Sequence, residues 1–179
     1  MIFTAIETLG GHVAVAKEFK NNLPNLWYAM AQYDPWADEL VPPAEDIMTD
    51  HLDEIIGLKK FDTSQLVAPL SSVNSGQAIG DVITYDAQDW VVVSDDDALK
   101  YGARYVYLDV TINPGDLPYS MYRQIGVFSG LIPAKGSTDK SILVPTQVSD
   151  YGLLIGYDNR LSQRYTDNMK IIEKIVLKF

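Results

Sequence analysis

The sequence contains no cysteine and two histidines in 179 residues. Without cysteine, the chain can form neither a disulfide nor a thiolate metal site. Zinc needs several nitrogen or sulfur ligands, yet His12 and His51 lie in different segments with no second histidine at ligand spacing. We therefore expect no metal site and no cofactor. The lack of cysteine is also compatible with synthesis in the reducing cytoplasm of a host bacterium.

Long hydrophobic runs are missing as well. The apolar runs are short, as at Trp90 to Val93 and at Ile175 to Leu177, whereas a membrane-spanning helix needs roughly 20 apolar residues. The N-terminus also lacks a basic segment followed by an apolar one. We therefore expect neither a membrane span nor a signal peptide.

Basic residues are few: there are 14 Lys and Arg against 24 Asp and Glu, which gives a formal net charge of −10. Because an acidic surface repels phosphate backbones and no segment is rich in Lys or Arg, we expect no nucleic-acid partner. The acidity has two interpretations. It increases solubility, and it makes assembly depend on specific contacts, since like charges oppose non-specific association.

Motifs of catalytic and phosphate-binding sites are also absent. The sequence has no Gly-x-Ser-x-Gly elbow and no P-loop, and Gly10-Gly11 lacks the dinucleotide-binding pattern. Asp95-Asp96-Asp97 lacks the ligand spacing of a calcium loop, so we interpret it as a capped helical turn that follows Ser94. These absences predict a protein that is not an enzyme, with a hydrolase using paired carboxylates as an open alternative.

The sequence does contain enough apolar residues for a core, 47 % of the chain, in short segments separated by turns. The clearest predicted strand is Arg104 to Asn113, where apolar residues alternate with polar and tyrosine residues. Asn113-Pro114-Gly115-Asp116 then predicts a turn. We expect a mostly β (α+β) fold, an antiparallel β-sandwich-like domain with one or two short helices near the N-terminus.

Other elements follow from periodicity and turn residues. Helices are predicted at Val13 to Phe19, where Val15 and Phe19 are four residues apart, and at Thr49 to Ile56, where Leu52, Ile55 and Ile56 share one face with Met48. Asp158-Asn159 predicts a turn. Residues 1–24 are expected to form an N-terminal arm or helix, a candidate interface element, and residues 25–179 a β-rich structural domain. Further strands are expected at residues 26–33, 65–70, 81–85, 90–94, 122–129, 142–148, 153–157 and 171–179.

Aromatic residues are plentiful, with 3 Trp, 11 Tyr and 5 Phe. Tyr105 and Tyr107 lie on the polar face of the predicted strand, and an amphipathic ring suits a protein interface or a sugar platform. Together with Tyr101, they would form the platform of a carbohydrate- or receptor-binding β module, which is our alternative function. Cross-strand packing also explains these residues.

Three stretches carry a resemblance to a known family. The first is Trp27-Tyr28-Ala29-Met30-Ala31-Gln32-Tyr33-Asp34-Pro35-Trp36, followed by Asp38-Glu39 and Pro42-Pro43. The second is Tyr122-Arg123-Gln124-Ile125-Gly126-Val127-Phe128, with Leu131 and Pro133 after it. The third is Val148-Ser149-Asp150-Tyr151-Gly152-Leu153-Leu154, then Asp158-Asn159-Arg160, Arg164 and Asp167. Their order and spacing resemble wedge-type structural proteins of contractile-tailed bacteriophage baseplates, over residues 25–179.

The resemblance implies a structural virion component of the tail baseplate that has no cofactor and is present in multiple copies around the tail axis. The implied partners are other baseplate or tail proteins, with no nucleic acid among them. Arginines in so acidic a chain are candidates for ion pairs, within the subunit or between subunits. The candidate structural or interface residues are Trp27, Trp36, Tyr105, Tyr107, Arg123, Arg160 and Arg164.

Overall fold

A computed structural model describes residues 5–73 and 80–179, so the first four residues of the predicted arm lie outside the described part. The chain divides into two compact units. The first unit comprises Met1–Leu23, Thr63–Asp109 and Lys174–Phe179, and the second comprises Pro24–Asp62 and Val110–Glu173. The regular secondary structure of the described residues is mostly antiparallel strand, with one α-helix near the N-terminus, which confirms the predicted fold class.

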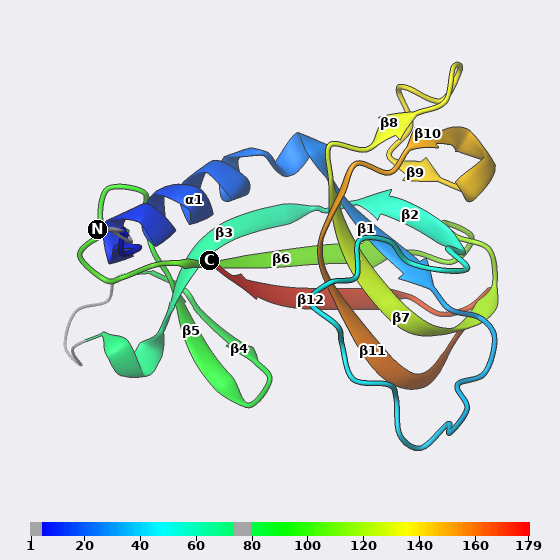
Figure 1. Cartoon of the computed structure of the whole chain (residues 1–179), viewed down its shortest axis with the longest axis horizontal. Helices are drawn as coiled ribbons and strands as arrows, with labels where there is room; N and C mark the ends of the chain where they lie inside the picture. Colours follow the sequence, from blue (N-terminus) through cyan, green and yellow to red (C-terminus); the bar gives the residue numbers. More distant parts are fainter. Residues whose placement is uncertain (1–4, 74–79) are drawn as a thin grey trace, which may run out of the picture. The chain divides into compact units, whose positions relative to one another are not determined.

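The α-helix, α1 (Leu9–Asn21), belongs to the first unit (Figure 1). Thr8 caps its N-terminus, because the Thr8 hydroxyl oxygen accepts a hydrogen bond from the Gly11 N–H at 3.2 Å. On its buried face, the ring of Phe19 lies 4.8 Å from the ring of Phe179, measured between centroids. The predicted helix is confirmed, and it is longer than expected at both ends.

The first unit also contains β3 (Thr63–Pro69), β4 (Val82–Tyr85) and β5 (Gln88–Val92), with a 3-10 turn at Leu70–Ser72 after β3. These strands belong to a sheet in the order β12-β6-β3-β5-β4. The unit boundary falls within the two remaining strands, which are β6 (Tyr105–Ile112) and β12 (Ile171–Lys178). The core of this unit is built around Val67, Trp90 and Tyr107.

Residues 94–102 confirm part of a prediction. The Ser94 hydroxyl accepts a hydrogen bond from the Asp97 N–H at 3.3 Å, so the expected capping contact is present. The segment that follows is a series of turns and not a helix. Lys20 from α1 pairs with the Asp95 carboxylate at 2.7 Å, which ties this turn to the helix.

The second unit is built on a five-stranded sheet in the order β11-β7-β1-β2-β9 (Figure 1). All neighbouring pairs in it are antiparallel. Short 3-10 turns occupy Leu23–Asn25 and Pro145–Gln147, and β8 (Ile132–Pro133) pairs with β10 (Val148–Asp150). The strands of the larger sheet are β1 (Leu26–Ala31), β2 (Gly57–Lys60), β7 (Ser120–Ser129), β9 (Ile142–Leu143) and β11 (Leu153–Tyr165).

Three predictions of local structure are wrong. Residues 49–56 form no helix, and Glu54 has a φ of +50°, outside the right-handed helical region. The predicted turn at Asp158-Asn159 lies inside the continuous strand β11. The strand predicted at residues 142–148 is divided by a 3-10 turn that begins at Pro145, a residue that cannot donate to a strand ladder.

Candidate functional site

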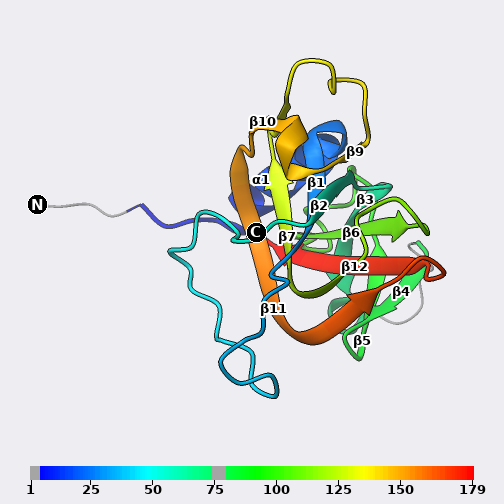
Figure 2. The same cartoon turned by 90° about the vertical axis from the view of Figure 1, so that its right-hand side faces the viewer.

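The β1–β2 loop (residues 32–56) is a long irregular connection between two adjacent antiparallel strands of the second unit. It has 25 residues, whereas loops beyond about 12–15 residues are uncommon in compact domains and are usually functional or disordered. In Figure 2 the loop is traced in blue to cyan and extends beyond β11. Many of its residues are tied to the sheet by hydrogen bonds, so the loop is ordered and a functional role is the better explanation.

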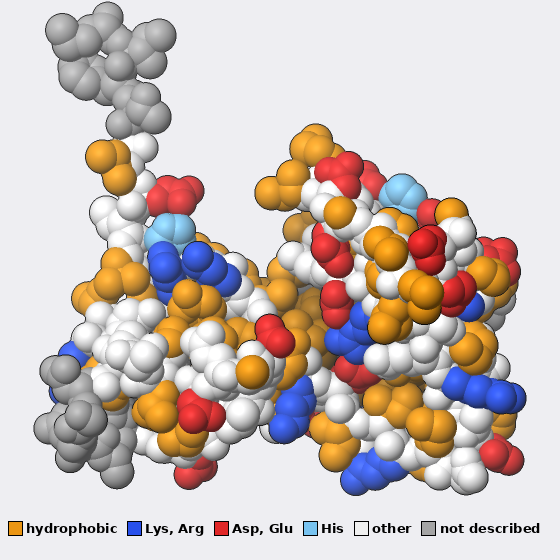
Figure 3. Space-filling model, turned by 90° about the horizontal axis from the view of Figure 1, so that it is seen from below, with side chains coloured by type: hydrophobic (Ala, Val, Ile, Leu, Met, Phe, Trp, Pro, Cys, Tyr) orange, Lys and Arg blue, Asp and Glu red, His pale blue; other side chains and the backbone are white. Residues whose placement is uncertain are grey.

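Charge and exposed apolar residues are concentrated together in the β1–β2 loop. It contains eight carboxylates and no Lys or Arg, so its formal charge is −8 out of −10 for the whole chain. In the right-hand half of Figure 3, hydrophobic side chains are interspersed with acidic ones at the surface. The eight carboxylates belong to Asp34, Asp38, Glu39, Glu45, Asp46, Asp50, Asp53 and Glu54.

Hydrogen bonds close the base of the loop. The Asp34 N–H donates to the Glu54 carboxylate at 3.1 Å, and the Ile56 N–H donates to the Met30 carbonyl at 2.7 Å. Leu52 is buried against β7, where a Cβ added to Gly126 would lie 2.5 Å from the Leu52 side chain. The glycine in β7 therefore makes room for the apolar anchor of the loop.

Arg123 holds the first half of the loop. Its guanidinium Nε donates to Glu39 Oε1 at 2.7 Å and to Oε2 at 3.1 Å, and its Nη1 donates to the Tyr33 carbonyl at 2.6 Å. The arginine itself is 5 % exposed. Charge-assisted hydrogen bonds of this kind are stronger than neutral ones, so residues 33–39 have a defined conformation on β7.

The loop is also bonded to β11, which is an edge strand of its sheet. The Trp36 indole N–H donates to the Arg160 carbonyl at 3.0 Å. Asn159 donates from its backbone N–H to the Glu45 carboxylate at 3.0 Å and from its side-chain amide to the Pro43 carbonyl at 2.9 Å. These bonds cover part of an edge whose free backbone groups would otherwise invite pairing with another strand.

Two turns of similar construction project from this fixed frame. In the first, the Asp38 carboxylate accepts the Leu40 N–H at 2.9 Å and the Asp38 carbonyl accepts the Val41 N–H at 3.2 Å. In the second, the Asp46 carboxylate accepts the Met48 N–H at 2.9 Å and the Asp46 carbonyl accepts the Thr49 N–H at 3.0 Å. Aspartate favours such turns because its side chain bonds to the backbone two residues on.

Large apolar side chains occupy the tips of these turns. Leu40 and Val41 are 83 % and 65 % exposed, and Ile47 and Met48 are 98 % and 81 % exposed. The second turn is fixed in addition by the Tyr157 hydroxyl of β11, which donates to the Asp46 carbonyl at 3.2 Å. Clustered exposed apolar residues on ordered backbone mark a binding surface better than single exposed residues do.

Arg160 pairs within the second unit, below the loop. Its guanidinium donates to Asp158 at 2.6 Å and to Glu173 at 2.8 Å, and the buried Glu173 also accepts from the Tyr122 hydroxyl at 3.2 Å. Burial alone would lower the pKa of Arg160, but the two carboxylates raise it above its ordinary value. Arg160 therefore stays charged, and its guanidinium is fixed within the second unit while its carbonyl accepts from Trp36.

Three other predicted site residues lie away from the loop surface. Trp27 is 2 % exposed in the core of the second unit, with the Lys60 ammonium 5.2 Å from its ring centroid. In the first unit, the Tyr105 ring packs edge-on against Trp90 at 5.0 Å, and Tyr107 is buried. Burial also raises the pKa of Tyr107 to about 12. A buried Tyr107 cannot be part of an exposed sugar platform, which argues against the carbohydrate-binding alternative.

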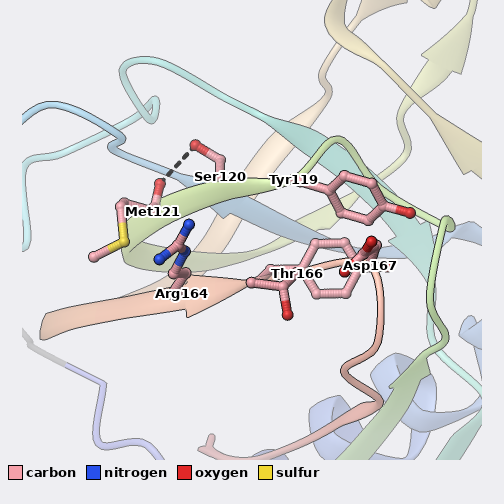
Figure 4. Close-up of a pocket in the computed structure, with 7 residues that line it drawn as sticks. Tyr119, Ser120, Met121, Arg164, Thr166 and Asp167 are labelled. Atoms are coloured by element: carbon pink, nitrogen blue, oxygen red, sulfur yellow. Dashed lines mark hydrogen bonds between the residues drawn. The ribbon is translucent and has the colours of Figure 1, made fainter.

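Arg164, the last predicted site residue, is exposed on β11. It lines a groove of about 460 Å³ together with Tyr119 and Met121. In Figure 4 the Met121 side chain lies beside Arg164, and the Tyr119 ring lies farther along the groove. The arginine ion pairs found among the described residues involve Arg123 and Arg160 but not Arg164. An ion pair between subunits at Arg164 therefore stays a prediction.

His51 forms a local charge cluster in the loop. Its Nδ1 lies 2.6 Å from the Asp50 carboxylate and its Nε2 lies 3.6 Å from Asp53. The hydrogen bond with Asp50 raises the pKa of His51 above its ordinary value. Across residues 5–73 and 80–179, no group of three or more His, Asp or Glu is arranged to hold a metal ion. Within the same ranges, no helix is long and apolar enough to cross a membrane.

The β-rich chain displays apolar side chains on ordered turns, and comparison with known proteins assigns it to a family of structural proteins. The family model described as "Baseplate wedge 3 tail fiber network component" matches residues 4–179. The chain is 31 % identical over 173 residues to Virion protein 3 of Enterococcus phage phiEF24C, covering 97 % of this chain and 94 % of that protein. The chain therefore belongs to the family of baseplate wedge 3 tail fiber network components, as the resemblance predicted, and is a structural component of a phage virion tail.

Proposed function

We propose that the chain is a non-enzymatic subunit of a contractile-tail baseplate, and that it assembles by binding neighbouring tail proteins through the β1–β2 loop. The observation that carries the proposal is the display of four large apolar side chains on two hydrogen-bonded turns. The absence of nucleophile and phosphate-binding motifs supports the non-enzymatic part.

Preorganisation of the loop supports a binding role. Ordering a flexible loop at an interface costs about 0.5–1.5 kcal/mol for each immobilised side chain, and part of that cost falls away when the backbone is already held. The contacts of Arg123 and Trp36 hold it before any partner arrives. The turns are thus ready to insert apolar side chains into pockets of a neighbouring protein.

The proposal extends to copy number, synthesis and partners. Multiple copies would surround the tail axis, after synthesis in the cytoplasm of the host bacterium. A net charge of −10 supports the expectation that nucleic acid is not a partner. The lack of cysteine is compatible with folding under reducing conditions.

Phage particles that carry Leu40→Ser together with Ile47→Ser test the proposal. We expect the amount of this chain in purified particles to fall by about tenfold or more, since each lost apolar anchor removes about 1.5–3 kcal/mol of burial. Quantitative mass spectrometry of the particles gives the measurement. The matched control is Leu153→Ser, which changes a residue 70 % exposed outside the loop and should leave incorporation unchanged. Equal incorporation of both variants would reject the loop as the assembly surface.

A further inference from the structure

We infer that the occupant of the β1–β2 loop surface is a different protein, with a basic surface surrounding apolar pockets. This inference rests on the proposed function, because it names the chemistry of the partner that the loop binds. The loop has two properties that a partner must match. The exposed apolar turns require pockets, and the excess of carboxylates requires cations around them.

The carboxylates of the loop are mostly uncompensated. Only Glu39 forms an ion pair with an arginine or lysine among the described residues, through Arg123. Asp50 and Asp53 lie beside the His51 imidazole. Docking the turns against a neutral or acidic protein would strip water from these carboxylates without compensation. Lys and Arg on the partner would replace that water with charge-assisted hydrogen bonds.

The same charge disfavours a second copy of this chain as the occupant. Two β1–β2 loops would bring together two segments of charge −8 each, and the whole chain carries −10. Like charges placed opposite each other across an interface cost several kcal/mol. A symmetric contact between two copies through this loop would bury the carboxylates of both loops against each other. The loop therefore suits a protein of opposite charge.

The turns also define how the partner is recognised. Leu40 and Ile47 lie on separate turns, joined through the stiff Pro42-Pro43 pair. Pro43 is held by Asn159 of β11, so the two turns are presented from a fixed spacer. The partner therefore needs two apolar pockets rather than one, with the basic side chains between and around them.

A photo-crosslinking amino acid placed at Ile47 in intact phage particles identifies the occupant. We expect cross-links to a different tail protein, at a surface rich in Lys and Arg, mapped by mass spectrometry of the joined peptides. The same amino acid at Leu153 is the control and should not reach that surface. Cross-links to a second copy of this chain, to an acidic surface, or to nothing would overturn the inference. Absence of the unmodified chain from particles would instead reject the proposed function.

A pair of charge variants tests the electrostatic part independently. Asp53→Lys and Asp96→Lys change the net charge of the chain equally, but Asp53 lies in the loop and Asp96 is exposed in the first unit. We expect Asp53→Lys to lower incorporation into particles by about fivefold or more and Asp96→Lys to leave it within about twofold. Equal incorporation of the two variants would contradict a basic partner at the loop.

Discussion

Arg123 ties the β1–β2 loop to β7 through hydrogen bonds to two of its residues. The planar guanidinium donates in two directions at once, to the Glu39 carboxylate and to the Tyr33 carbonyl. A lysine at this position would place one compact charge between the two acceptors and could not match both geometries. At the scale of the residue, the conformation of an exposed loop thus depends on a side chain that is itself buried.

Arg123→Met should lower the free energy of unfolding by about 2 kcal/mol, because Glu39 loses its partner but keeps some contact with water. Hydrogen exchange of the backbone amides at residues 33–39 should accelerate at the same time. Arg164→Met is the control, since an exposed arginine without an ion pair in the described structure should change stability by less than about 0.5 kcal/mol. Urea denaturation and exchange mass spectrometry provide both measurements. Equal stability of the two variants would contradict the role of Arg123.

The His51 imidazole offers a second prediction at this scale. Asp50→Asn should lower the pKa of His51 toward its ordinary value, because the Asp50 hydrogen bond is the main cause of its increase. With a raised pKa in the folded state, the contribution of His51 to stability is complete below its ordinary pKa. It is lost as pH rises through the raised value. An NMR titration of the imidazole checks the shift, with Asp96→Asn as the control that should leave it in place.

At the scale of elements, local sequence patterns predicted some strands and helices correctly. They failed where contacts with residues distant in the sequence determine the backbone conformation. Strict alternation predicted β6 correctly, since its apolar face covers a core. The apolar spacing at Thr49 to Ile56 predicted a helix, but Leu52 and Ile56 are buried as separate anchors of an irregular loop. Asp158-Asn159 predicted a turn, but Asn159 donates to the loop and Asp158 pairs with Arg160 within β11, and a single sequence shows neither contact.

The connection into β11 provides a prediction about one element. Gly152 has a φ of +71°, and a Cβ added there would lie 2.3 Å from the Ser129 carbonyl oxygen. Gly130 has a similar φ of +76° with no atom within 4 Å of an added Cβ. Gly152→Ala should therefore destabilise by about 3 kcal/mol and Gly130→Ala by about 1–2 kcal/mol. Thermal or urea unfolding measures the loss of stability in each variant, and the difference between the two losses is the cost of the steric clash at Gly152. Similar losses in both variants would show that the cost comes from the positive φ alone.

At the scale of the whole molecule, the structure shows where the predicted site residues lie, which a single sequence could not. Trp36 lies in the β1–β2 loop and donates to the Arg160 carbonyl of β11, whereas Arg123 of β7 donates to Glu39 of the same loop. The exposed residues at the turn tips were missed, because no local pattern separates an exposed apolar residue from a buried one. The signal that was available is compositional, namely eight carboxylates without one Lys or Arg over 25 residues.

The concentration of charge on one loop also predicts how the isolated protein behaves in solution. At neutral pH and low salt it should be monomeric, because carboxylates surround the apolar turns and repel a second copy. Self-association should increase as the pH is lowered from about 7 toward about 5, where the charge approaches zero near the sequence pI of about 4.5. Ile47→Ser should reduce that association, since the exposed apolar side chain would supply its contacts. Sedimentation velocity across this pH range measures both effects, and a stable dimer at neutral pH and low salt would mean that like charge does not protect the loop.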